Sequence, residues 1–110
     1  MDTSELPIEP PYFEILTPVK VKVRTTPSYW AKIVTLKHSI MAGQEDVVKQ
    51  VLQEPMEVRR SLSDPEVYLY YKSDPPYFVC VVARHLNGEG FIITAYRTDK
   101  IKRGEIVWTR

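Results

Sequence analysis

The spacing of hydrophobic positions changes twice along this chain. Residues 19–24 alternate between valine and a basic residue, and a period of two is typical of an edge strand or an extended arm with one solvated face. Between residues 27 and 53 the apolar residues recur every three or four positions, which predicts helices. After Pro55 the period of two returns, so the following segments are predicted to form strands.

Two helices are predicted from capping residues and apolar spacing. Thr26 can cap the first helix through its side-chain oxygen, and Pro27 suits the first helical position because its missing N–H costs nothing there. This helix is expected to stop within residues 38–43. The second helix is predicted over residues 44–53, where two acidic residues in the first turn favour the helix dipole.

Strands are predicted after the helices, over residues 56–60, 66–72, 77–86 and 91–97. Short turns join them, so neighbouring strands are expected to be antiparallel. We therefore predict an α+β fold, with two N-terminal helices packed on one face of an about four-stranded antiparallel sheet. The opposite face is expected to be open and to carry Arg59, Tyr68, Tyr70, Lys72, Thr94 and Tyr96.

Length and composition bound the class of protein. The 110 residues suffice for one domain, which we expect over residues 17–110, and residues 1–16 are predicted to be a flexible, acidic, proline-rich leader. Residues 98–110 are expected to form a basic segment packed back on this domain. The single cysteine, Cys80, excludes an internal disulfide. No apolar run is long enough to span a bilayer, and no signal peptide is evident, so we expect a cytoplasmic location without a membrane.

Charge is unevenly distributed along the chain. The predicted leader contains four acidic residues and no basic one, so the remaining chain carries +5 although the total net charge is +1. A basic domain of this kind is compatible with a polyanionic partner such as a nucleic acid.

Several short motifs together carry a resemblance to a known group of proteins. They are Trp30–Val34, Lys37-His38, Met41, Glu54-Pro55, Val58–Ser61, Ser63–Pro65, Tyr70–Lys72, Phe91–Tyr96 and Ile101–Glu105. Over roughly residues 30–108 the chain resembles small bacterial proteins, common in cyanobacteria, that are placed among the phage and toxin nucleases of the barnase, EndoU, colicin and RelE-like superfamily. The resemblance implies two helices on a four-stranded antiparallel sheet, and a ribonuclease activity.

RNA cleavage without a metal moves the ribose 2′-OH onto the adjacent phosphate, which requires a base, an acid and cations. His38 is the candidate acid or base, because imidazole titrates near neutral pH. Arg59 could clamp a phosphate, and Thr94 could orient it. Tyr70 and Tyr96 could donate protons or stack on bases, which completes the predicted catalytic set. Substrate-binding residues are predicted at Arg60, Lys72, Lys100, Lys102 and Arg103.

Each candidate also has a purely structural interpretation. His38 can favour the negative end of a helix dipole, residues 59–60 can be a solvated strand end, and Thr94 can reflect β propensity. The tyrosines can fill the sheet, and the basic residues 100–103 can be solvated. Cys80 lies among valines, which favours a core thiol over a nucleophile. No metal-ligand spacing or phosphate-binding glycine loop is present, so no metal and no cofactor are expected.

The sequence therefore predicts a metal-independent endoribonuclease of the RelE-like toxin type, with RNA as substrate and a cognate antitoxin protein as a candidate partner. Two alternatives stay open. One is a non-catalytic RNA- or protein-binding module on the same fold. The other is an interaction protein that pairs through the edge at residues 19–24.

Overall fold

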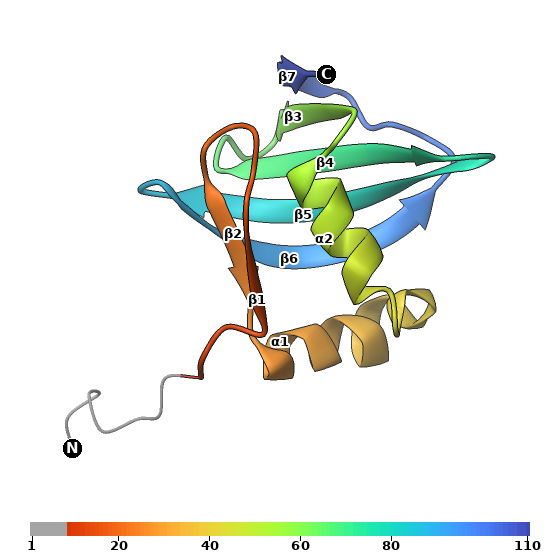
Figure 1. The fold of residues 1–110 in the computed structure, drawn as a ribbon. Coiled ribbons are helices and arrows are strands. Elements are labelled where there is room, and N and C mark those ends of the chain that lie inside the picture. Colours follow the sequence, from red (N-terminus) through yellow and green to blue (C-terminus); the bar gives the residue numbers. More distant parts are fainter. Residues whose placement is uncertain (1–8) are drawn as a thin grey trace.

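One sheet dominates the fold, and its strands come from both ends of the described chain. The computed structural model describes residues 9–110, and the strand order within them is β1-β2-β6-β5-β4-β3-β7 (Figure 1). The strands are β1 (Phe13–Leu16), β2 (Lys22–Thr25), β3 (Glu57–Ser61), β4 (Val67–Asp74), β5 (Tyr77–Leu86), β6 (Glu89–Thr98) and β7 (Gly104–Thr109). The helical segments are α1 (Pro27–Lys32), the π-helical turn η2 (Ile33–Lys37), the 3₁₀ turn η3 (Ser39–Met41) and α2 (Glu45–Gln53).

The predicted fold class is wrong in the size and topology of the sheet. The part of the chain that the structure describes forms a seven-stranded mixed sheet, because β2 runs parallel to β6 whereas the other neighbouring strands are antiparallel. Strands β1 and β2 precede the helices, and β7 adds to the outer side of β3. These strands are short and join the sheet through backbone hydrogen bonds, so their pairing leaves little trace in the side-chain pattern.

The sheet begins inside the segment predicted as a leader. Residues 1–8 of that segment lie outside the described residues, but Phe13–Leu16 form β1, and Phe13 is only 8% exposed. Strand β2 lies between β1 and β6, so the prediction of an edge at residues 19–24 is wrong. Val23 is fully buried in this internal strand.

The first helix begins where its capping residues predict. The backbone N–H of Tyr29 donates to the Thr26 hydroxyl (3.2 Å), and Pro27 is the first helical residue. The helix then widens into the π-helical turn η2, in which the His38 N–H donates to the Ile33 carbonyl (2.7 Å). None of the helices within residues 9–110 is long and apolar enough to cross a membrane.

The main hydrophobic core lies between the helical segments and one face of the sheet. Helix α2 crosses this face, and α1 lies along its margin (Figure 1). The core joins Trp30 and Ile33 to Val81 of the central strand and to Val23 of β2. Strand β2 approaches β6 so closely that a Cβ on Gly90 would lie 2.8 Å from Val23 Cγ2, and only glycine fits there without displacement.

Two tyrosines predicted for the open face lie on the helix-covered face instead. Tyr70 is fully buried, and its hydroxyl contacts the Thr17 hydroxyl (3.2 Å) and His85 Nε2 (2.9 Å). Tyr68 packs against the same core and stacks on the His85 ring, with 3.9 Å between ring centroids. Lys72 shares this face, because it pairs with Val79 of the core. The alternation in β4 does not reveal the faces, since Leu69 and Tyr71 are also buried.

The opposite face holds a second, smaller hydrophobic cluster. Leu69, Tyr71, Cys80 and Val82 form it, and the segment that crosses from β6 to β7 covers part of it with Ile101. This segment is also fixed by its backbone, because the N–H of residue 102 donates to the Tyr71 hydroxyl (3.0 Å). The face opposite the helices is therefore covered in part and remains accessible beside the crossing segment.

We expect the stability of the protein to fall as the pH falls from 6.5 towards 4. Burial lowers the pKa of His85 from 6.5 to about 4, so between these values the unfolded chain binds a proton that the folded chain does not. Lowering the pH from about 7 to about 5 should cost at most about 2 kcal/mol through this group. Urea unfolding at both pH values measures the effect. In His85→Gln the free energy of unfolding should change less between the two pH values. An equally large change in this variant would mean that other groups cause the pH dependence.

Candidate functional site

The sheet face opposite the helices carries a hollow of about 350 Å³, which we call the basic hollow. Leu69 and Val82 belong to its floor, and the turn after β3 and the crossing segment before β7 form its sides. Its lining residues are Ser61, Leu62, Ser63, Val67, Leu69, Val82, Thr94, Tyr96, Lys102 and Arg103. Four of the ten residues predicted for the site are among them.

Strand register explains why distant residues meet at the basic hollow. Arg59, Leu69, Val82 and Thr94 are successive cross-strand neighbours on β3, β4, β5 and β6, so they form one row on this face. With a spacing of about 4.8 Å between strands, the backbones of Arg59 and Thr94 lie about 14 Å apart. The two residues therefore flank the hollow from opposite ends of the row.

Two buried hydroxyl groups at the basic hollow are unsatisfied. The Thr94 and Tyr96 hydroxyl oxygens are inaccessible to solvent and have no hydrogen-bond partner among the described residues. An unsatisfied buried group costs about 1–3 kcal/mol, so each hydroxyl would gain a partner if rotation of its side chain exposed it to a ligand in the hollow. Burial, reinforced by Cys80, raises the pKa of Tyr96. Its phenol therefore stays protonated at neutral pH and can donate a hydrogen bond.

Positive charge reaches the basic hollow from the crossing segment. Lys102 Nζ lies 5.6 Å from the centroid of the Tyr96 ring, and neither Lys102 nor Arg103 forms an ion pair with any residue in the range 9–110. Arg59 differs, because its Nε is paired with Glu57, and its Nη1 donates to the Lys102 carbonyl (3.4 Å). Arg59 thus supports the crossing segment, whereas the two exposed cations can meet an anion.

His38 lies beside the basic hollow at the outer side of β6. Its ring contacts Tyr96, with 5.4 Å between ring centroids and an interplanar angle of 38°. The π-helical turn η2 positions the histidine, since its N–H closes the last hydrogen bond of that turn. Short π-helical segments occur frequently at functional sites. No feature of the sequence distinguishes this turn from an ordinary helix end.

Four predicted site residues lie away from the basic hollow. Tyr70 is enclosed in the core on the opposite face, where burial raises its pKa. Lys72 Nζ donates to the Glu54 carbonyl at the end of α2 (2.9 Å). Arg60 is paired with Glu105 of β7, and Lys100 is exposed in the turn after β6. Tyr70, Arg60, Lys72 and Lys100 are therefore not brought together with His38.

Ser61 and Ser63 line the basic hollow, although neither was predicted as a site residue. Their hydroxyl groups lie 3.1 Å apart, and Ser63 also donates its backbone N–H to the Ser61 hydroxyl (3.3 Å). The turn chemistry of residues 61–65 was the available signal in the sequence, and it indicates a bend without indicating which face the bend borders.

The described residues offer no group of three or more His, Cys, Asp or Glu side chains that could hold a metal ion. Cys80 is buried, and burial raises the pKa of its thiol to about 11, which opposes a role as a nucleophile. Comparison of the chain with protein-family models, curated proteins and solved structures finds no match.

Threonine-to-valine substitutions compare the contribution to stability of the Thr94 hydroxyl with that of the hydrogen-bonded Thr17 hydroxyl. We expect Thr94→Val to leave stability unchanged or to raise it by about 1 kcal/mol, because it removes a buried group that has no partner among the described residues. Thr17→Val is the matched control. It should cost about 1–3 kcal/mol, since the Thr17 hydroxyl bonds to Tyr70 and to the Val21 carbonyl. Urea unfolding of both variants measures this, and equal losses would contradict it.

Proposed function

We propose that this protein is a metal-independent endoribonuclease whose substrate crosses the basic hollow. The observation that carries the proposal is the contact between His38 and Tyr96 at the border of a hollow that also holds Thr94, Lys102 and Arg103. Transfer of the 2′-oxygen to phosphorus requires an acid–base group and cations, and a hydroxyl group such as that of Thr94 can help to orient the phosphate.

The proposed reaction starts with removal of the ribose 2′ proton by His38. The 2′-oxygen then attacks the adjacent phosphorus, the bond to the 5′-oxygen breaks, and the products are a 2′,3′-cyclic phosphate and a 5′-hydroxyl. Lys102 and Arg103 balance the charge that develops on the phosphate oxygens, and the Thr94 hydroxyl orients the phosphate. His38 then passes the proton that it took from the 2′-OH to the leaving 5′-oxygen, and Tyr96, whose phenol stays protonated, supports the imidazole through the contact between their rings.

The toxin assignment extends the same proposal. A RelE-like toxin would act in the cytoplasm and would be held inactive by a cognate antitoxin protein. An antitoxin that places acidic side chains over Lys102 and Arg103 would block the basic hollow, because these two side chains are exposed. Residues Tyr70, Arg60, Lys72 and Lys100 have no part in this version of the site.

A non-catalytic RNA-binding module is the second candidate, and one ion pair favours it. Arg59, the predicted phosphate clamp, is already neutralised by Glu57. A site without this clamp retains the cations that attract a phosphate backbone but loses a group that stabilises the transition state.

Incubation of the purified protein with RNA in the presence of EDTA distinguishes the two candidates. We expect cleavage to persist in EDTA and to yield cyclic-phosphate ends. His38→Ala should reduce the rate by about 100-fold or more, because general acid–base groups contribute factors of this size. His85→Gln is the matched control, since the other histidine is held by Tyr70 on the opposite face and should retain activity. RNA binding without product would leave only the binding module.

Substitutions of the exposed cations test the binding step separately. Lys102→Ala and Arg103→Ala should each weaken RNA binding and reduce the slope of log affinity against log salt by about 1. Lys32→Ala removes an exposed cation at the end of α1 and should leave both quantities unchanged. Equal effects of all three variants would mean that RNA binds through overall charge rather than through the basic hollow.

A further inference from the structure

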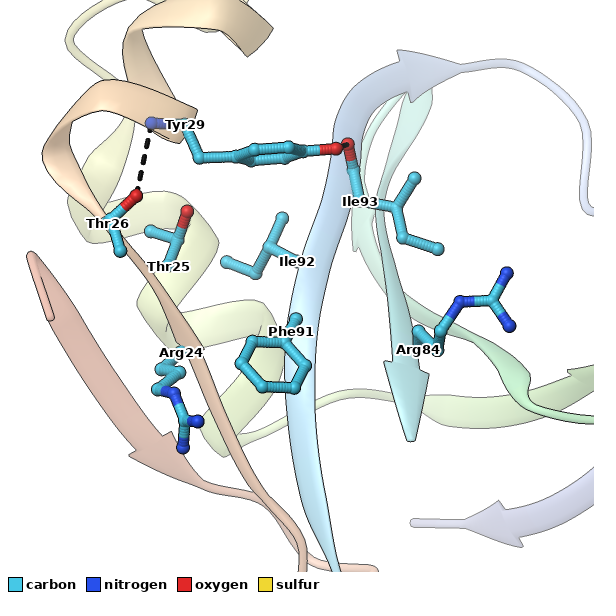
Figure 2. Close-up of a pocket in the computed structure, with 8 residues that line it drawn as sticks. All are labelled: Arg24, Thr25, Thr26, Tyr29, Arg84, Phe91, Ile92 and Ile93. Atoms are coloured by element: carbon cyan, nitrogen blue, oxygen red, sulfur yellow. Dashed lines mark hydrogen bonds between the residues drawn. The ribbon is translucent and has the colours of Figure 1, made fainter. Parts of the chain in front are cut away.

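A second hollow of about 350 Å³, which we call the β2–β6 pocket, opens where these two strands separate (Figure 2). Their parallel pairing ends at Arg24 and Phe91, and beyond this point α1 rather than β2 lies beside β6. The pocket is lined by Arg24, Thr25, Thr26, Tyr29, Arg84, Phe91, Ile92 and Ile93. It takes no part in the proposed cleavage step.

The walls of the β2–β6 pocket suit a flat, apolar group. Tyr29 lies along one side and Phe91 on the opposite side, with Ile92 of β6 between them (Figure 2). Tyr29 is held in place because its hydroxyl donates to the Ile93 carbonyl (3.1 Å). Arg24 Cζ lies 4.3 Å from the centroid of the Phe91 ring, and Phe91 is still 39% exposed, so a ligand can contact the part of the ring that Arg24 does not cover.

The two arginines that line the β2–β6 pocket are paired with carboxylates, and Lys37, whose Nζ lies 5.4 Å from the centroid of the Tyr29 ring, is not among the lining residues. Arg24 lies 2.6 Å from Glu89, and Arg84 lies 3.0 Å from Glu66 and 3.1 Å from Asp64. An anion would have to displace these carboxylates, whereas a neutral group leaves every ion pair intact. The pocket therefore favours a neutral occupant, in contrast to the basic hollow, whose two exposed cations form no ion pair with the part of the chain that the structure describes.

Thr25 contributes a buried polar atom to the β2–β6 pocket. Thr25 is 4% exposed, and its hydroxyl oxygen forms no hydrogen bond with the residues that the structure describes. A hydroxyl can both donate and accept, so a planar ligand with a polar edge would satisfy it. A nucleobase combines this polar edge with a flat face for aromatic contact.

The β2–β6 pocket and the basic hollow are neighbours on the sheet. Arg84 of the pocket pairs with Val67 of the hollow, and Ile93 of the pocket precedes Thr94 of the hollow. Residues two positions apart along a β-strand are separated by about 7 Å, so the pocket and the hollow lie about this far apart. This distance is about twice the rise per nucleotide in a stacked nucleic-acid strand. An unstacked nucleotide can bridge this distance.

We propose that the β2–β6 pocket binds one unpaired nucleobase of the RNA strand whose backbone crosses the basic hollow. This inference rests on the proposed function for the identity of the ligand. It assigns single-stranded RNA as the substrate class, because a base that is paired in a helix cannot enter the pocket.

Titration of the isotope-labelled full chain with each of the four ribonucleosides, followed by NMR, tests the pocket without requiring cleavage. We expect chemical-shift changes centred on Thr25, Tyr29 and Phe91. Phe91→Ala should weaken nucleoside binding about tenfold, in line with the contribution of one stacked base. Thr25→Val should weaken it by roughly fivefold to tenfold, in line with the loss of one hydrogen bond. Ile106→Ala is the matched control, because Ile106 is an exposed apolar residue (52%) of β7, and it should leave binding unchanged.

A second measurement separates this inference from the proposed function. Phe91→Ala should bind single-stranded RNA about tenfold more weakly than the Ile106→Ala control does. With an abasic RNA, which has the same backbone but no bases, the two variants should bind equally well. The inference would be overturned if Phe91→Ala and Thr25→Val cleaved RNA at the unmodified rate and if nucleosides caused no chemical-shift changes at the pocket. The ribonuclease proposal would survive that result. Nucleoside shifts at the pocket without any RNA cleavage would support the pocket and overturn the ribonuclease.

Discussion

The interrupted pairing of β6 governs the rest of the structure. Strand β6 follows β5 along its length, but β2 accompanies it over only three residue pairs. Backbone groups beyond that point need other partners, and Tyr29 and Lys37 supply them by donating to the Ile93 carbonyl. This requirement holds the π-helical turn against β6 and brings His38 to Tyr96. The same interruption leaves the β2–β6 pocket, so both candidate sites derive from one incomplete ladder.

Charge divides the face opposite the helices into two regions of different chemistry. Around the β2–β6 pocket Arg24 and Arg84 are balanced by carboxylates, whereas Lys102 and Arg103 at the basic hollow form no ion pair within residues 9–110. A polymer with flat neutral bases and a charged backbone matches this division. A small anion would match only the basic hollow, and an apolar ligand would match only the pocket.

Local features of this fold were predictable from the sequence, but the faces of the sheet were not. Thr26 and Pro27 mark the start of α1, and the turns after the central strands lie close to their predicted positions. Residues 67–71 are buried or half-buried on both sides, so their alternation does not reveal which side meets the helices, and Tyr70 was assigned to the wrong face. The parallel pairing of β2 and the crossing of residues 99–103 depend on backbone contacts between distant segments. Lys102 and Tyr96 were therefore identifiable as candidates, but their proximity was not.

The outermost strand β7 has a consequence for entry to the basic hollow. Among residues 9–110 its only strand partner is β3, yet it anchors the segment that borders the hollow. Strands bound on a single side open locally at a lower free energy than the central strands beside them. Fraying of β7 would loosen that border while the main core stays folded. Access to the hollow for a long, flexible molecule would thus depend on the local stability of one peripheral strand, without global unfolding.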